Sequence, residues 1–217
     1  MTNDSRVPEW LVDEISDVFN VLPLIEALRG LGQLIDEKES ELYSLYEDVA
    51  PKYRDVGLEQ GLEAVTIILG AGFVAAQSIL TSTFVSVKRL AKIDIVQSTS
   101  SCNIPTTKSE LFQIAAYDRM GVPDIVGINA LANFFKHSSE WSYDWSGLTR
   151  TLEIETASTA KKLGLRPGDP DNMMKGASAL MFGGHDGLSK LASRVSEWRE
   201  SVTVEMKQRL KQSKLLS

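Results

Sequence analysis

The sequence predicts an all-α protein, an up-and-down type bundle of six to eight helices with a long buried central helix. Apolar residues recur three and four positions apart through most of the chain, and prolines and glycines separate these segments. Strand-like alternation occurs only at Trp141, Tyr143 and Trp145, which is too short to build a sheet. With 217 residues, 43% of them hydrophobic, the chain can bury a sizeable core. We expect a single domain over residues 1–217, with two smaller domains as the alternative.

Prolines bound the first two expected helices. Pro8 suits the first turn of a short amphipathic helix, and Pro23 interrupts its pattern. A second helix is expected from about residue 24 to 49, before Pro51, with the charged run DEKESE as its solvated face. Apolar residues at helical spacing give this helix an inward side: Leu28, Leu31, Ile35, Leu42, Leu45 and Val49.

The third segment, from about residue 58 to 93, has no charged residue between Glu63 and Lys88. It is long enough to cross a membrane, which requires roughly 20 apolar residues. Its second half carries several hydroxyl and amide side chains, and the other helices need a surface to pack on. We therefore favour a central bundle helix over a membrane span, and we expect Gly70 and Gly72 to let neighbouring helices approach closely.

Turn and capping residues organise the second half of the chain. A polar loop at residues 97–106 precedes Thr107 and Glu110, whose spacing is typical of a capping box. This box opens a helix expected over Lys108–Met120, which Gly121 would end.

Three further segments follow. Pro123 and Asp124 open a helix that carries the stretch NALANFFKHSSEW, residues 129–141. The helical pattern continues from Leu148 to Leu163, and the connector RPGDPDN comes next. Asp186 is the expected cap of the last helix, whose apolar residues share one face: Leu188, Leu191, Val195, Trp198, Val202 and Met206.

Composition excludes several classes of function. A single cysteine, Cys102, cannot form an intramolecular disulfide or a CxxC metal cluster, and no zinc-ligand cluster, serine-hydrolase elbow or dinucleotide glycine motif occurs. The net charge of −6 argues against a globally basic nucleic-acid binder but allows a local basic patch. The N-terminus resembles neither a secretory signal nor a transit peptide. We expect a cytoplasmic protein with no cofactor, no metal and no membrane insertion.

The stretch at residues 129–141 contains the most reactive group of side chains. Residues three and four apart share a helix face, so one polar stripe is expected to contain Asn129, Asn133, Lys136, His137 and Glu140. The opposite side would be apolar: Ile125, Ile128, Leu131, Phe134 and Phe135. His137 could transfer a proton near neutral pH, and Lys136 could hold a phosphate. Alternatively, the stripe satisfies its own polar groups and holds an adjacent helix.

Two further groups have a functional and a structural interpretation. Trp141, Tyr143 and Trp145 could stack on bases or anchor a protein partner, but such a cluster more often fills the end of a bundle. The stretch GGHDGLSK places His185 before the last helix, where an anion could bind. We favour a loop and a helix cap there.

The stretch NFFKHSSEW, on a helix near the middle of an all-helical chain, resembles bacterial proteins of the HEPN superfamily. Their motif is an Arg and a later His with four to six residues between them, often with Asn directly after the Arg. Asn133 and His137 match the Asn and the His, whereas Ala132 occupies the place of the Arg. The resemblance implies a toxin or an antiviral defence protein that binds RNA.

The resemblance also implies a mechanism. Two motifs face each other across a homodimer, and His and Arg promote attack of an RNA 2′-hydroxyl on the neighbouring phosphorus without a metal. In this chain His137 and Asn133 would take part, and Lys136 or Arg119 would replace the absent Arg. The alternative is a non-catalytic interaction, immunity or regulatory module, whose stripe and aromatic cluster bind a protein partner.

Overall fold

The computed structural model describes residues 6–17, 19, 21–48, 51–142, 144–184 and 186–216. Tyr143, His185 and Val49 therefore lie outside the described residues. The α-helices are α1 (Glu9–Asp13), α2 (Leu22–Asp48), α3 (Pro51–Ala91), α4 (Asp94–Ser98), α5 (Lys108–Leu111), α6 (Asp124–His137), α7 (Thr151–Lys162), α8 (Asn172–Ala179) and α9 (Gly187–Gln212). A 3-10 turn, η2 (Ser138–Glu140), follows α6, and a hairpin of β1 (Asp118–Arg119) and β2 (Val122–Pro123) precedes it.

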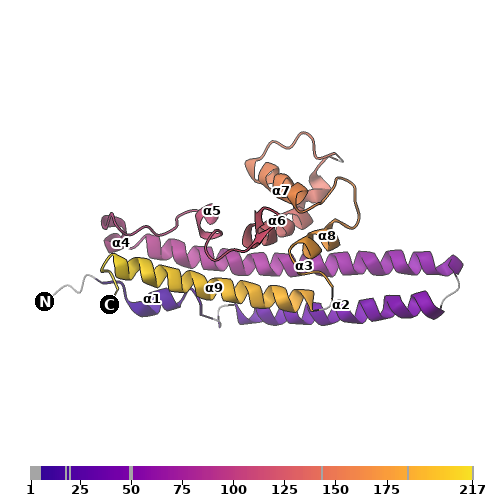
Figure 1. Cartoon of the computed structure of the whole chain (residues 1–217), viewed down its shortest axis with the longest axis horizontal. Helices are drawn as coiled ribbons and strands as arrows, with labels where there is room; N and C mark the ends of the chain where they lie inside the picture. The colour runs from indigo at the N-terminus through magenta and orange to yellow at the C-terminus, as the bar shows by residue number, and fades with distance from the viewer. Residues whose placement is uncertain are drawn as a thin grey trace.

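The predicted all-α architecture is confirmed (Figure 1). Nine α-helices lie within the described residues, and three of them have five residues or fewer, so six longer helices carry the fold. Pro23 lies in the first turn of α2 instead of interrupting a helix, as expected for a residue that lacks a backbone N–H.

The long helices define the shape of the molecule. α2 and α3 form an antiparallel hairpin, and α9 lies along one side of both, while α6, α7 and α8 lie on the other side of α3 (Figure 1). The predicted central helix is therefore confirmed as α3, which contacts α2, α6, α8 and α9. Residues Asp55–Ala91 are long and apolar enough for a membrane span by length and composition, and half of their most apolar window is buried.

Glycines on α3 allow close helix packing, as the sequence predicted. A Cβ atom built at Gly70 would lie 2.1 Å from the Phe135 ring of α6. At Gly72 it would lie 2.6 Å from Leu188 of α9. Both distances are too short for real carbon atoms, so larger residues at these positions would push α6 and α9 away from α3.

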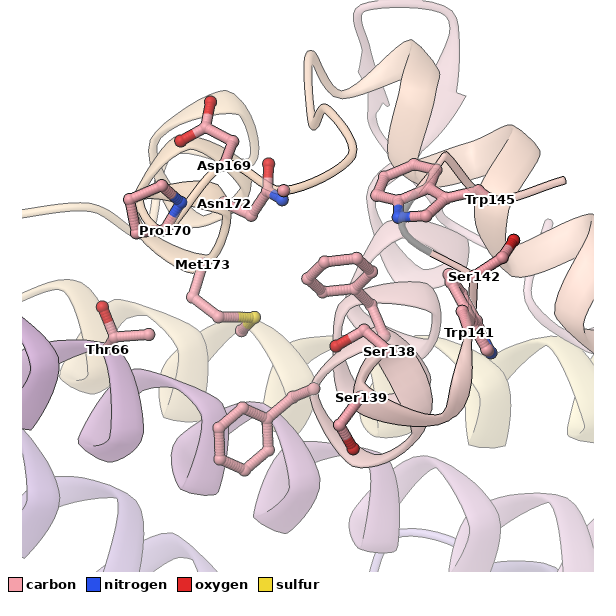
Figure 2. Close-up of a pocket in the computed structure, with 13 residues that line it drawn as sticks. Thr66, Ser138, Ser139, Trp141, Ser142, Trp145, Asp169, Pro170, Asn172 and Met173 are labelled. Atoms are coloured by element: carbon pink, nitrogen blue, oxygen red, sulfur yellow. The ribbon is translucent and has the colours of Figure 1, made fainter.

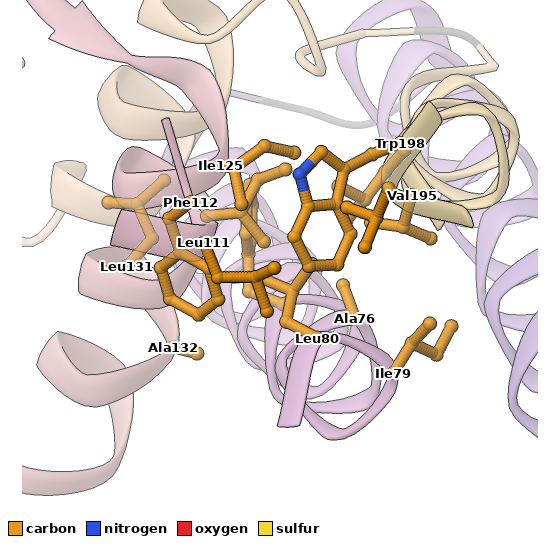
Figure 3. Packing of buried hydrophobic residues seen from close by; sticks show 14 of the residues in the cluster. Ala76, Ile79, Leu80, Leu111, Phe112, Ile125, Leu131, Ala132, Val195 and Trp198 are labelled. Carbon is orange, nitrogen blue, oxygen red and sulfur yellow. The ribbon is translucent and has the colours of Figure 1, made fainter. Parts of the chain in front are cut away.

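The main core lies where α3, α6 and α9 meet (Figure 3). The fully buried ring of Trp198 on α9 packs edge to face on Phe112, with a centroid distance of 5.8 Å. Ala132, which occupies the place of the family's Arg, is also fully buried in this core. An Arg at position 132 would therefore place its charge among apolar side chains instead of beside His137.

The helix expected over Lys108–Met120 is wrong beyond Leu111, although its capping box is confirmed at Thr107 and Glu110. Ala115 adopts a left-handed conformation with φ of 48°, and its carbonyl accepts a hydrogen bond of 2.7 Å from Nη2 of Arg194 on α9. A distant side chain thus competes with the local helix pattern, which the sequence spacing does not reveal.

The hairpin that replaces this helix turns tightly. Met120 and Gly121 have φ of 57° and 74°, and β1 pairs with β2 directly on either side of them. Two consecutive left-handed residues are characteristic of a type I′ hairpin turn. Gly121 therefore lies in a hairpin turn and does not end a helix.

Candidate functional site

α6 positions most of the predicted site. Its apolar side enters the core as predicted: Ile125, Ile128 and Leu131 are fully buried, Phe134 nearly so, and Phe135 packs on Gly70. The polar stripe lies toward α3 at its centre and reaches the surface only at its C-terminal end. Asn133 is buried and only 6% exposed, whereas the His137 side chain is 42% exposed.

The centre of the stripe is a hydrogen-bonded network. Nε2 of Gln77, on α3, donates to Oδ1 of Asn129 at 2.9 Å and to Oδ1 of Asn133 at 2.8 Å. Oε1 of Gln77 accepts from Nζ of Lys136 at 2.6 Å. Three predicted site residues are thus brought together by one amide, and they join α6 to α3.

This network predicts the effect of replacing Gln77. Gln77→Ala removes the partner of the buried Asn133 oxygen, so we expect the free energy of unfolding to fall by about 1–3 kcal/mol. Urea denaturation of the wild type and the variant measures this loss. Ser78→Ala is the matched control because Ser78 is exposed and bonds only to the carbonyl of Val74 in its own helix. Equal stabilities of the two variants would contradict the network's role.

Two ammonium groups lie near this network. Nζ of Lys108, at the start of α5, is 3.4 Å from Oγ1 of Thr81 on α3. Burial and, secondarily, the charge of Lys136 lower the pKa of Lys108 below its ordinary value. The two lysines are thus close enough to repel each other, and they form a local basic patch beside α6.

His137 lies at the C-terminal end of α6 with a carboxylate beside it. Its Nδ1 is 3.5 Å from Oε1 of Glu140, one turn further on. This places a carboxylate on the Nδ1 side of the imidazole ring, opposite Nε2. His137 also lines a small cavity of about 60 Å³ together with Asn133, Trp141, Arg150, Leu152, Glu153 and Thr156.

Arg150 is a cationic residue that lines the same small cavity as His137. It directly precedes the first residue of α7, its side chain is 76% exposed, and its Nη1 lies 3.4 Å from Oε1 of Glu153. The sequence did not indicate Arg150, because it follows His137 by thirteen residues and comes from another helix. Glu153 and Thr156 were missed for the same reason.

Arg119 does not join this group. It lies in β1, and its guanidinium is 6.0 Å from the centre of the Tyr117 ring. The hairpin precedes α6, whereas His137 ends it, and 14 helical residues span about 20 Å. Within one chain the cation beside His137 is therefore Arg150, while Lys136 donates to Gln77.

Two residues of the predicted aromatic cluster, Trp141 and Trp145, form a triad with Phe134 at the end of α6. Phe134, Trp141 and Trp145 make edge-to-face contacts at centroid distances of 5.5–5.8 Å. Trp145 is buried with φ of 55°, and Nζ of Lys161 lies 5.9 Å from the centre of its ring. Nε1 of Trp141 is buried without a hydrogen-bond partner.

An open cavity of about 530 Å³ adjoins this triad (Figure 2). Trp141, Trp145 and the serines of η2 form one side of it, and Asp169, Asn172 and Met173, around the start of α8, form the other. This volume suits a small organic ligand. Trp141 lines both this cavity and the small cavity at His137.

The site residues can supply a proton acceptor, a permanent cation and aromatic surfaces. Among the described residues, no group of three or more His, Cys, Asp or Glu side chains is placed to hold a metal ion. Comparisons with protein-family models, with curated proteins and with solved structures find no match to this chain.

Proposed function

We propose that the two cavities at the end of α6 bind RNA and that His137 cleaves it without a metal ion. The observation that carries this proposal is the shared cavity of His137 and Arg150. A histidine next to a carboxylate is suited to general base catalysis, and a guanidinium is suited to the oxygens of a phosphate. The resemblance of NFFKHSSEW to HEPN proteins supports placing this activity in a toxin or defence system.

The proposed reaction is an internal transfer. Nε2 of His137 takes the proton of an RNA 2′-hydroxyl, and the oxygen attacks the adjacent phosphorus. Arg150 stabilises the charge that develops on the non-bridging oxygens. The 5′-oxygen leaves with a proton from the His137 of a second copy, and a 2′,3′-cyclic phosphate remains. A homodimer with facing His137 cavities, as in the family it resembles, is part of this proposal.

The large cavity would hold a base next to the reacting phosphate. Its walls include the partly exposed rings of Phe135 and Trp141, and stacking on such rings contributes about 1–3 kcal/mol per base. The ring of Trp141 separates this base site from the His137 cavity. Together the two cavities match the alternation of base and phosphate in a single strand.

The test is incubation of a mixed RNA pool with the purified protein in the presence of a chelator, followed by analysis of the product ends. Cleavage that leaves 2′,3′-cyclic phosphates is the expected result. RNA that stays intact, or products with 5′-phosphates and 3′-hydroxyls, would overturn the cleavage proposal.

A non-catalytic module is the second candidate. The observation that favours it is the network in which Asn133 and Lys136 already bond to Gln77, because these groups then hold helices together. Filter binding tests this candidate. If the module binds RNA, the protein retains RNA at the same cavities without cleaving it. If the partner is a protein, no RNA is retained.

A further inference from the structure

The packing of α9 between α2 and α3 stops abruptly at its first turn. Leu188 is the second residue of α9, and a Cβ atom built at Gly32 of α2 would lie 3.6 Å from its Cβ. A Cβ atom built at Gly72 of α3 would also contact Leu188. Within the described residues, α2 and α3 continue beyond this level as two helices, and no third helix lies along this side of them (Figure 1). We call the part between residues 36 and 63 the arm.

Apolar side chains on the arm continue the side that α9 covers. Tyr43 follows Gly32 by eleven residues, or three helical turns, so it points to the same side of α2, and it is 74% exposed. Leu62 precedes Gly72 by ten residues, which places it about 80° around α3 from Gly72, and it is 42% exposed. Because Leu42 packs on Gly61, Tyr43 and Leu62 lie at the same level of the hairpin. The arm thus has an empty position for a third helix.

The arm also carries the net charge of the protein. It contains nine acidic and three basic residues, a net charge of −6 that equals the net charge of the whole chain. The other residues together are therefore formally neutral. A second copy in this position would bring its own acidic arm and be repelled, whereas a basic helix would be attracted. Glu39 and Glu47 flank Tyr43 one turn away on either side.

We propose that the arm binds a basic amphipathic helix of a partner protein, end to end with α9. The apolar side of this helix covers Tyr43 and Leu62, and its lysines or arginines reach Glu39 and Glu47. α2, α3 and the bound helix then form a three-helix bundle along the arm, as α2, α3 and α9 do beside it. This surface is separate from the cavities at His137.

A synthetic helix of about 21 residues, with leucines at heptad positions a and d and lysines elsewhere, is a suitable probe. Fluorescence anisotropy of the labelled peptide measures its affinity for the full-length protein. We expect Tyr43→Ala and Glu39→Lys each to weaken binding at least tenfold. Glu37→Lys makes the same charge change about 200° around α2, and we expect less than a twofold effect.

Several results would overturn this proposal. The first two are no binding of the probe at low salt and equal affinity for a peptide of the same composition in scrambled order. Equal losses for Glu39→Lys and Glu37→Lys would indicate unspecific attraction to an acidic surface. A homodimer that Tyr43→Ala converts to a monomer in sedimentation would identify a second copy as the occupant. Cleavage of RNA is independent of all these outcomes.

Discussion

Replacing His137 by alanine is expected to slow metal-independent RNA cleavage by about 100- to 10,000-fold, because the reaction loses its general base. The His137 side chain is 42% exposed at the end of α6 and is not part of the hydrophobic core, so its removal leaves the core intact. Time courses of a fluorescent RNA substrate in chelator measure the effect. Urea denaturation of the same variant checks that the fold is unchanged.

Arg150 provides the second part of this test. Arg150→Ala is expected to slow cleavage by about 100-fold or more, since one charged donor to a transition state contributes at least this much. The matched control is Arg89→Ala, in the exposed last turn of α3, which removes the same charge far from His137. If cleavage survives in both His137→Ala and Arg150→Ala, the small cavity is not the catalytic site.

Replacing Asp124 by alanine is expected to lower the free energy of unfolding by about 3–5 kcal/mol, the usual loss when one partner of a buried ion pair is removed. The Asp124 and Arg194 side chains are 2% and 8% exposed, and two hydrogen bonds join them. Asp124 also accepts hydrogen bonds of 2.9 Å from the backbone N–H groups of Tyr117 and Ile125. Chemical denaturation measures the loss.

Two variants complete this measurement. Asp118→Ala changes an exposed carboxylate in the hairpin that precedes α6. Asp118 accepts one hydrogen bond from Gly121, so the expected loss is at most about 1 kcal/mol. Asp124→Leu combined with Arg194→Met is expected to lose less than Asp124→Ala, because no charge then stays buried alone. Equal stabilities for Asp124→Ala and Asp118→Ala would contradict the role of the ion pair.

The sequence predicted those parts of the fold that depend on neighbouring residues. The long helices and the capping box at Thr107 follow from spacings of three and four residues, and the structure has them. The helix expected beyond Leu111 failed because its path depends on Arg194, which bonds to Ala115 across 79 positions in the chain. Local periodicity contains no information about such a contact.

The same limit explains what was missed at the site. Spacing placed Asn129, Asn133 and Lys136 on one side of a helix, but the group that binds all three, Gln77, comes from α3. Arg150 lines the same cavity as His137, although it lies thirteen residues further along the chain and outside α6. The residue spacing within one helix therefore predicted the polar stripe. The cavity is built from several elements, and only the structure reveals it.

The most direct test of RNA binding at the cavity of His137 and Arg150 is an NMR titration with a dinucleotide. Its 2′-hydroxyl is replaced by hydrogen, so that it binds but cannot be cleaved. We expect the dinucleotide to shift the NMR signals of the His137 imidazole, the Arg150 guanidinium and the Trp141 indole N–H. All three side chains line one cavity. The indole N–H groups of Trp10 and Trp198 provide internal controls, because both residues lie outside the two cavities. Unchanged signals from His137 and Arg150 at saturating dinucleotide would contradict RNA binding at this cavity.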